Sequence, residues 1–337
     1  MLCRNSPTKQ YEKLEKHFLD IFFFSKFLVI NVDERIKRKF LGAMLWHALG
    51  DALGSNYEFY GLEQTSKLTL RDLERDFYRY TDDTVMMLCI ARSIVDNNGF
   101  DEKDILIRYI EEYNKSNIRG IGMTTRKALS RYIKEKIFPP GVISFWAAGN
   151  GVAMRVTPIA LYCYNRREDV LYEYVRRDAY LTHRNELAIS GAFAVALGIR
   201  YSFYLNDKER IVEETLRTLE KFGIANRVYD RIERAISFVE RGDSHIENLE
   251  KIGTGGYVVE SVACAFYCFY VSKSPLDAIL LAIRGGGDTD TNAAIAGALA
   301  GAFYGYMEHE YFSKLESYDE IKNLAEQLYL ISSGKVI

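Results

Sequence analysis

The feature that most constrains the fold of this chain is a helical hydrophobic period that persists along most of its 337 residues. Apolar residues recur every three or four positions, as on one face of an α-helix, and alternating strand patterns are nearly absent. The chain has only five prolines, which interrupt helix interiors. Its glycines gather at junctions between helical segments. The sequence therefore predicts a single all-α domain over residues 33–337.

The same period defines the predicted helices. They are Asp33–Leu53, Thr84–Val95, Asp101–Tyr113, Thr124–Ile137, Arg166–Leu181, Glu186–Tyr204, Lys208–Phe222, Tyr229–Arg241, Tyr257–Val271, Leu276–Ile283, Thr291–Met307 and Tyr318–Leu330. Gly54 follows the first helix in the position of a C-terminal cap. In Thr291–Met307, Gly297, Gly301 and Gly305 share one face, a spacing that lets two helices approach closely. We therefore expect a tightly packed helix near the C-terminus.

Composition excludes some partners. Hydrophobic residues make up 48% and charged residues 27%, and the net charge of −2 provides no basic field for nucleic acid. The five cysteines are an odd number, and three lie within apolar helical runs, which favours reduced, buried thiols in a cytoplasmic protein. Cys264 and Cys268 lie one turn apart and could bind a soft metal, but core packing is the favoured interpretation because no histidine accompanies them.

Residues 1–32 form an extension of unknown role. Its segment Phe18–Val32, "FLDIFFFSKFLVINV", is apolar but contains Asp20 and Lys26. It is shorter than the ~20 apolar residues of a membrane-spanning helix. It also lacks the cleavage site of a signal peptide. A packed extra helix, a membrane-surface segment and a leader from an upstream start codon remain open.

An oxygen-rich loop precedes the predicted helix near residue 84. It reads Thr81-Asp82-Asp83-Thr84, so four successive residues offer a side-chain oxygen. One interpretation is a helix N-cap, but a cap needs a single oxygen. Adjacent carboxylates repel each other unless a cation or hydrogen-bond donors lie between them. The loop therefore also predicts a cation site.

A second loop shows the same excess of oxygen. Asp288-Thr289-Asp290-Thr291 follows three glycines, and side chains two apart on an extended loop point the same way. Carboxylates and hydroxyls suit Mg²⁺, Mn²⁺ or Ca²⁺, and the absence of His and Cys argues against zinc. Neither loop completes an octahedral site. Together the two loops could hold one or two metal ions.

Four other stretches carry polar groups with two interpretations each. Asp51 and Glu58 are either solvated acids after the first helix or, for Glu58, a general acid or base beside a metal. Gly149-Asn150-Gly151 is a turn or a cradle for phosphate oxygens. His183 lies in a cap before Glu186, where a structural histidine is the alternative. Gly253–Tyr257 opens another helix and suits an anion or a planar ligand.

Taken together, these stretches resemble one family. They are "GAMLWHALGDALGSNYEF", "YTDDTVMM", "GNGVAMRVTPIAL", "THRN", "GTGGYVVESVACAFYCF" and "GGGDTDTNAAIAGALAGAFYG". The set is similar to the ADP-ribosylglycohydrolases, which include the dinitrogenase-reductase-activating glycohydrolases. The stretches follow the order of the family and extend from about Lys37 to Met307. Any single stretch is modest support, whereas all of them in order are specific.

The resemblance implies an all-α orthogonal multi-helix bundle with a metal site at helix ends that holds two Mg²⁺ or Mn²⁺ ions. It assigns the metal ligands to Thr81, Asp82, Asp83, Asp288, Asp290 and Thr291. Glu58 and Asp82 become the candidate catalytic carboxylates. The candidate substrate-binding residues are Gly149, Asn150, Gly151 and His183 near the diphosphate, Tyr257 near the adenosine, and Gly286 and Gly287 beside the ions. Ala147 and Ala148 depart from the family pattern, which often has Ser there, so one hydrogen bond to the substrate is in doubt.

The reaction implied is hydrolysis of the glycosidic bond that joins ADP-ribose to an arginine or serine side chain, or to a small conjugate. The expected partner is an ADP-ribosylated protein or a small ADP-ribose conjugate, without nucleic acid or a membrane span, and the expected state is a cytoplasmic monomer. Two alternatives stay open: a two-metal phosphohydrolase acting on a nucleotide, and a non-catalytic ADP-ribose-binding member of the family.

Overall fold

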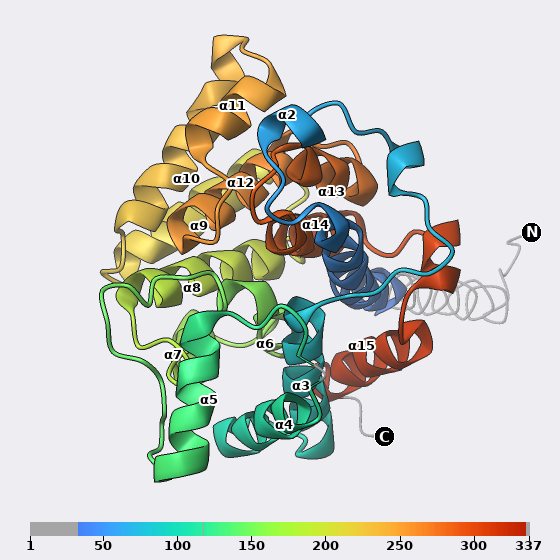
Figure 1. Cartoon of the computed structure of the whole chain (residues 1–337). Coiled ribbons are helices and arrows are strands. Elements are labelled where there is room, and N and C mark those ends of the chain that lie inside the picture. Colours follow the sequence, from blue (N-terminus) through green and yellow to red (C-terminus); the bar gives the residue numbers. More distant parts are fainter. Residues whose placement is uncertain (1–32, 117, 335–337) are drawn as a thin grey trace, which may run out of the picture.

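The computed structural model describes residues 33–116 and 118–334, and within them the chain is helical throughout, with isolated β-bridges and no strand (Figure 1). The first described helix spans residues 33–54. The α-helices that follow are α2 (Leu62–Thr65), α3 (Asp82–Asp96), α4 (Glu102–Asn114), α5 (Met123–Glu135), α6 (Thr157–Tyr162), α7 (Glu168–Ala179), α8 (Glu186–Tyr201), α9 (Lys208–Lys221), α10 (Arg227–Ser237), α11 (His245–Ile252), α12 (Val258–Val271), α13 (Pro275–Arg284), α14 (Thr289–Tyr304) and α15 (Tyr318–Ser332). The all-α prediction is confirmed.

Helix 33–54 and α14 pack against each other along their lengths, antiparallel and with their backbones in contact (Figure 1). A Cβ on Gly42 would lie less than 3.0 Å from the backbone of Gly301, and one on Gly297 would do the same at Trp46. Only glycine permits such backbone contact. The predicted close packing of the glycine-bearing helix is confirmed.

This antiparallel pairing places the end of one helix beside the start of the other. A Cβ on Gly54 would overlap the backbone of Thr289, and the Thr289 hydroxyl donates a 2.8 Å hydrogen bond to the Gly54 carbonyl. The two predicted loops around Glu58 and Asp288 therefore meet. The site begins at this junction.

Two glycine predictions need correction. Gly54 is not a left-handed cap, because its φ is −69° and the chain continues into a 3₁₀ turn, η1 (Ser55–Tyr57). Its missing Cβ serves the close contact with α14 instead. Gly305 is not part of the helix, because α14 ends at Tyr304 and Gly305 follows it with φ of +81° as the C-terminal cap, but its backbone still packs against Gly42.

The remaining helices surround this pair. α12 packs between α14 and α10, and α3 packs against α15 (Figure 1). Their facing sides form one apolar core with fully buried aromatic rings, among them Trp46, Phe193 and Phe266. The core fixes the helix ends at which the polar loops gather.

Several smaller elements were not predicted, including α2, α6 and α11, because each is a short helix of at most eight residues. Four described cysteines are free and buried, as predicted: Cys89, Cys163, Cys264 and Cys268. Cys3 and the interpretations of Phe18–Val32 lie outside the described residues. None of the helices in the described ranges is long and apolar enough to cross a bilayer.

Candidate active site

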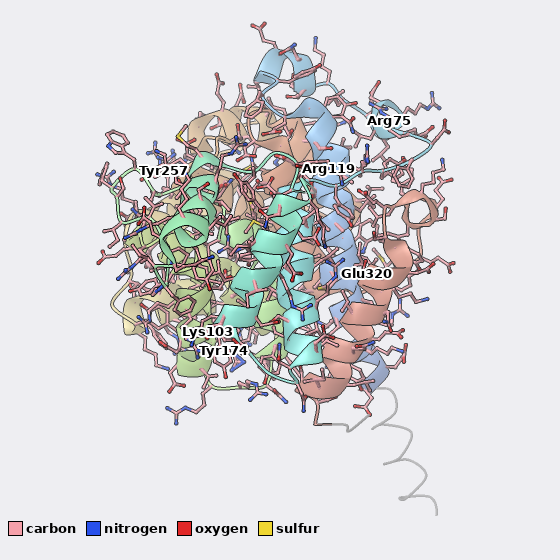
Figure 2. The ribbon with its side chains drawn as sticks, turned by 60° about the horizontal axis from the view of Figure 1, so that its bottom comes forward. Arg75, Lys103, Arg119, Tyr174, Tyr257 and Glu320 are labelled. Carbon is pink, nitrogen blue, oxygen red and sulfur yellow. The ribbon has the colours of Figure 1, made fainter. Side chains whose placement is uncertain are left out.

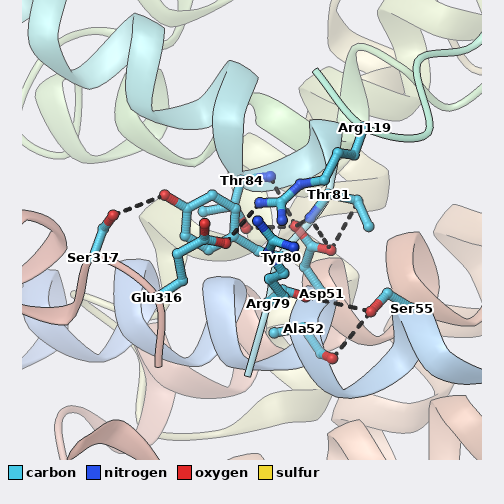
Figure 3. Close-up of polar contacts among 10 residues, drawn as sticks. All are labelled: Asp51, Ala52, Ser55, Arg79, Tyr80, Thr81, Thr84, Arg119, Glu316 and Ser317. Carbon is cyan, nitrogen blue, oxygen red and sulfur yellow. Dashed lines mark hydrogen bonds and ion pairs between the residues drawn. The ribbon is translucent and has the colours of Figure 1, made fainter. Parts of the chain in front are cut away.

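Asp51 organises the start of α3 from a neighbouring helix. It is buried on the last turns of helix 33–54, and both the backbone N–H and the hydroxyl of Thr81 and of Thr84 donate to its carboxylate (Figure 3). The distances run from 2.6 Å at the Thr84 hydroxyl to 3.0 Å at the backbone nitrogens. Burial raises the pKa of Asp51, and these hydrogen bonds offset part of that increase. Asp51 therefore fixes the loop that carries Asp82 and Asp83.

The two oxygen-rich loops do not cap their own helices. Thr81 and Asp288 occupy the N-cap positions of α3 and α14, and neither side chain accepts a hydrogen bond from its own helix. By contrast, Asp101, Asn185 and Asp207 accept such bonds at α4, α8 and α9. The capping interpretation of the first loop is therefore wrong for Thr81. Its hydroxyl donates to Asp51 instead.

The loop after helix 33–54 delivers Glu58 to the start of α14. The Phe59 N–H donates to the Gly287 carbonyl at 2.8 Å, and the Gly287 N–H donates to the Tyr60 carbonyl at 2.9 Å. Phe59 has a left-handed φ of +67° and its side chain is 83% exposed, both uncommon for phenylalanine. This clamp sets Glu58 beside Asp288.

These elements enclose an acidic cavity of about 260 Å³. It is lined by Glu58, Phe59, Asp82, Asp83, Gly120, Gly122, Met123, Thr124, Thr125, Gly149, Asn150, Gly151, Met154, His183, Gly256, Asp288, Asp290 and Thr291. One carboxylate oxygen from each of Glu58, Asp288 and Asp290 lies within 4.8 Å of the others. The two loops thus present their acids to one space.

Four acids of this cavity have raised pKa values. Burial, and then the charges of Asp288 and Asp51, raise the pKa of Glu58 to about 7. Burial also raises the pKa of Asp82, Asp83 and Asp290 well above the ordinary range, and neighbouring carboxylates add to the effect. Clustered carboxylates of this kind hold protons unless a cation neutralises them.

The donor set fits a hard divalent cation. Every candidate ligand is a carboxylate or hydroxyl oxygen, the kind that Mg²⁺ and Mn²⁺ prefer. The Oδ2 atom of Asp83 is buried and has no hydrogen-bond partner among the described residues, although buried carboxylate oxygens are normally satisfied. A cation would satisfy that orphaned oxygen. Thr81 donates its hydroxyl hydrogen to Asp51, which leaves oxygen lone pairs free.

The Gly149–Gly151 loop borders the acids on one side. The Asn150 side-chain amide donates to Asp288 Oδ2 at 2.7 Å, and the Asn150 backbone N–H donates to the Gly256 carbonyl. A Cβ on Gly151 would lie 2.8 Å from Cε1 of His183. The loop therefore lies directly against the histidine ring, and Asn150 orients a carboxylate as well as lining the cavity.

His183 is a buried imidazole joined to a buried chain of polar side chains. Its Nδ1 lies 2.8 Å from the Thr182 hydroxyl, which accepts a 2.8 Å hydrogen bond from Arg155. Arg155 is fully buried and pairs with Asp178 at 2.9 Å. Burial, and then the positive charge of Arg155, lower the pKa of His183 to about 3. His183 is therefore uncharged at neutral pH and cannot exchange a proton there.

The hydrogen bonds from Arg155 through Thr182 to His183 also determine which imidazole nitrogen carries the hydrogen. The buried Thr182 hydroxyl hydrogen needs an acceptor, and Arg155 can only donate. Among the described contacts of that hydroxyl, His183 Nδ1 is the acceptor available. The proton of His183 then belongs on Nε2, the nitrogen nearest a Cβ built on Gly149, at 3.6 Å. The ring thus offers an N–H donor at the glycine loop.

Tyr257 lies outside the acidic cavity. It lines a neighbouring aromatic cavity of about 480 Å³ together with Phe145, Trp146, Ala148, Gly149, Leu187, Arg227 and Gly256. Gly149 and Gly256 are common to both cavities, so the two adjoin. In Figure 2, Tyr257 is well separated from Arg119, which precedes the acidic-cavity residue Gly120.

Gly286 and Gly287 lie behind the acids rather than on the cavity wall. Their φ values are +67° and +74°. A Cβ would lie 2.7 Å from the Tyr60 carbonyl oxygen at Gly286 and 2.5 Å from that of Thr254 at Gly287. They shape the turn that holds Glu58 and Asp288 together.

The sequence did not single out several residues that the fold brings here. The sequence leaves open a solvated position for Asp51, whereas in the fold Asp51 is fully buried and orders the α3 loop. Gly120 has φ of +81°, and a Cβ there would lie 2.9 Å from Asp82 Oδ1. The Arg119 carbonyl above it accepts the Asp82 N–H at 2.7 Å. The one signal for this loop was the glycine pair Gly120 and Gly122 before α5.

A family model described as ADP-ribosylglycohydrolase matches residues 32–335 of this chain. The chain belongs to the ADP-ribosylglycohydrolase family. The match covers the whole described fold and all of the oxygen-rich loops, and it identifies the protein as a glycohydrolase enzyme.

Similar proteins agree with this membership. The ADP-ribosylhydrolase ARH3 of Homo sapiens is 30% identical over 87% of this chain and 93% of its own length. The ADP-ribosylarginine hydrolase Tri1 of Pseudomonas putida is 28% identical over 86% of this chain and 77% of its own length. A solved structure of an ADP-ribosylglycohydrolase-related protein complex superposes with a TM-score of 0.71 at 29% identity, over 89% of this chain and 99% of that one.

Proposed function

We propose that this enzyme hydrolyses the glycosidic bond between the distal ribose of ADP-ribose and a protein side chain or small conjugate, and releases ADP-ribose with the help of Mg²⁺ or Mn²⁺. The observation that carries the proposal is the convergence of Glu58, Asp288 and Asp290 within 4.8 Å, in a cavity that adjoins an aromatic one. The reacting ribose lies at the acids. The diphosphate lies against Gly149–Gly151 and His183, and the adenosine beside Tyr257.

The proposed ion ligands are Thr81, Asp82, Asp83, Asp288, Asp290 and Thr291. All except Thr81 line the acidic cavity, and Thr81 lies next to Asp82 at the start of α3. A divalent cation bound there orients ribose hydroxyls and makes a water nucleophile available near neutral pH. Gly286 and Gly287 hold the loops that carry these ligands.

Proton transfer is assigned to Glu58. Its pKa of about 7 lets it exchange a proton near neutrality, and its partial exposure lets water and a leaving group reach it. The Asp82 side chain is almost fully buried, and its backbone is fixed by the hydrogen bond from its N–H to the Arg119 carbonyl, which suits a ligand better than a proton carrier. Neutral His183 donates its Nε2–H to a diphosphate oxygen. Glycosidic cleavage passes through an oxocarbenium-like transition state, which the surrounding carboxylates stabilise.

The substrate linkage is tested directly. We expect free ADP-ribose to be released from arginine-linked or serine-linked peptides with Mg²⁺ or Mn²⁺, and not with EDTA. Both linkages are included because one relative is named as an arginine hydrolase, whereas the name of the other states no linkage. Release of AMP or phosphate would instead indicate a phosphohydrolase. Tight ADP-ribose binding without turnover, with metal supplied, would indicate a binding protein.

A further inference from the structure

The aromatic cavity continues into a third, basic cavity that the proposed reaction does not use. This outer cavity measures about 330 Å³ and is lined by Arg227, Asp230, Arg231, Arg234, Tyr257 and Val259. Arg227 and Tyr257 line both the aromatic and the outer cavity. The acidic, aromatic and outer cavities therefore adjoin one another in that order.

The charge of the outer cavity comes from one face of α10. Arg227, Arg231 and Arg234 are spaced i, i+4 and i+7, which places them on the same side of a helix. Asp230 is the one acidic residue among the lining residues. With three guanidinium groups and one carboxylate, the outer cavity carries a net positive charge. The acidic cavity at the other end of the row has the opposite charge.

The three arginines differ in the contacts that their side chains already make within the protein. Arg231 donates to the Ile252 carbonyl and ties α10 to the end of α11. Arg234 lies over the Phe238 ring at 5.6 Å. Arg227 is exposed and makes no ion pair or side-chain hydrogen bond with any described residue. Arg227 is therefore the least engaged of the three guanidinium groups, and it lies at the boundary with the aromatic cavity.

We propose that the outer cavity binds a phosphate group attached beyond the adenosine of the substrate, with Arg227 as its main contact. This inference rests on the proposed function, because the order ribose, diphosphate, adenosine along the first two cavities places the adenosine next to Arg227. One guanidinium group can donate two parallel hydrogen bonds to the oxygens of a phosphate, and the other two arginines add positive charge around that phosphate. Two substrates carry such a phosphate: the next unit of an ADP-ribose polymer, and ADP-ribose with a phosphate on its adenosine ribose.

Binding measurements separate these sources. Calorimetric titrations with Mg²⁺ present would compare ADP-ribose, 2′-phospho-ADP-ribose and a linear ADP-ribose dimer, with the dimer checked by chromatography afterwards. Because the site is exposed, we expect about fivefold tighter binding of at least one phosphate-bearing ligand than of ADP-ribose at low salt. The advantage should shrink as salt is raised. Preference for the phosphorylated ligand alone identifies a ribose phosphate, and preference for the dimer identifies a polymer.

The decisive variant is Arg227→Gln, with Arg210→Gln as the matched control. Arg210 is an exposed arginine on α9 that lines none of the three cavities. Arg227→Gln should abolish the preference, so that the phosphate-bearing ligands bind no more tightly than ADP-ribose does to the same variant, whereas Arg210→Gln should retain the full preference. Equal binding of all three ligands by the unmodified enzyme would overturn the inference and leave the proposed function intact. Failure to bind ADP-ribose at all would overturn both.

Discussion

Gly42 and Gly301 face each other where helix 33–54 crosses α14. They are so close that a Cβ added to either glycine would overlap the backbone of the other. The same contact recurs along the pair, at Gly50 against Ala293 and at Gly54 against Thr289. We call this row of backbone contacts the seam. It connects the core to the site, because its last contact, Gly54 against Thr289, lies close in sequence to Glu58 and Asp288. Packing in the middle of the bundle therefore determines the spacing of the acids.

Gly42→Ala is expected to destabilise the fold. The added methyl group has no room, and overpacking of this kind costs about 3 kcal/mol in the free energy of unfolding. Gly61→Ala is the matched control: a Cβ there would have its nearest neighbour at 3.9 Å, and it should cost less than about 0.5 kcal/mol. Urea denaturation of both variants measures the difference. Equal midpoints for Gly42→Ala and the unmodified protein would show that the seam is not tightly packed.

Asp51→Asn is expected to weaken metal binding without removing a proposed ligand. An amide has one acceptor oxygen in place of two, so part of the hydrogen bonding from Thr81 and Thr84 is lost and the α3 loop loosens. Loss of residues that orient metal ligands typically lowers affinity about tenfold or more. Titration with Mn²⁺ measures this. Asp72→Asn, at an exposed capping box outside the acidic cavity, is the control. Unchanged Mn²⁺ affinity in Asp51→Asn would contradict the organising role of Asp51.

Much of the fold was predictable because the helical period is strong. The bounds of α9, α12 and α13 agree with the predictions to within one residue at each end. Helix ends were less predictable, since Gly54 and Gly305 were interpreted from local rules alone. In the fold, Gly54 serves a contact with α14, far away in the sequence.

The site was predictable only in part. The two oxygen-rich loops and Glu58 stand out as excess acid near glycines, and the fold brings them to one cavity. Asp51 could not be assigned, because its partners Thr81 and Thr84 lie thirty or more residues away. The hydrogen bonds from Arg155 through Thr182 to His183 could not be predicted from the sequence either, because Arg155 lies in a separate segment of the chain.

Thr182→Val is expected to impair substrate binding through His183. The substitution keeps the shape but removes the hydroxyl that donates to Nδ1, so the Nε2–H form is no longer enforced. Loss of one buried hydrogen bond predicts about tenfold weaker ADP-ribose binding, with Mn²⁺ affinity unchanged. Nitrogen NMR of the unmodified protein should show His183 protonated on Nε2. A proton on Nδ1 would refute this account.

The control for that prediction is Tyr267→Phe. It removes a similar hydroxyl–imidazole contact, 2.7 Å from Tyr267 to Nδ1 of His245, at α11 and outside the acidic and aromatic cavities. It should leave ADP-ribose affinity unchanged. A comparable loss of affinity in both variants would mean that Thr182 acts through general stability.

The stability of the metal-free protein is expected to fall as pH rises through neutrality. The folded-state pKa of Glu58 is raised to about 7, whereas the pKa of a glutamate in the unfolded chain is about 4.3. The folded protein therefore binds the extra proton, and its stabilising effect is complete below the unfolded pKa and lost as pH approaches and passes 7. The raised pKa values of Asp82, Asp83 and Asp290 act in the same direction.

Divalent metal should reverse this dependence, because it binds the ionised acids. Mg²⁺ or Mn²⁺ should raise the melting temperature more at pH 8 than at pH 5.5, and an ion at about a hundred times its dissociation constant contributes about 2.7 kcal/mol. Melting curves with EDTA and with metal at both pH values measure the effect. In EDTA, Glu58→Gln should flatten the slope near neutrality, whereas Glu63→Gln, at an exposed site on α2, should not. Equal metal-induced shifts at both pH values would mean that the ions do not bind these carboxylates.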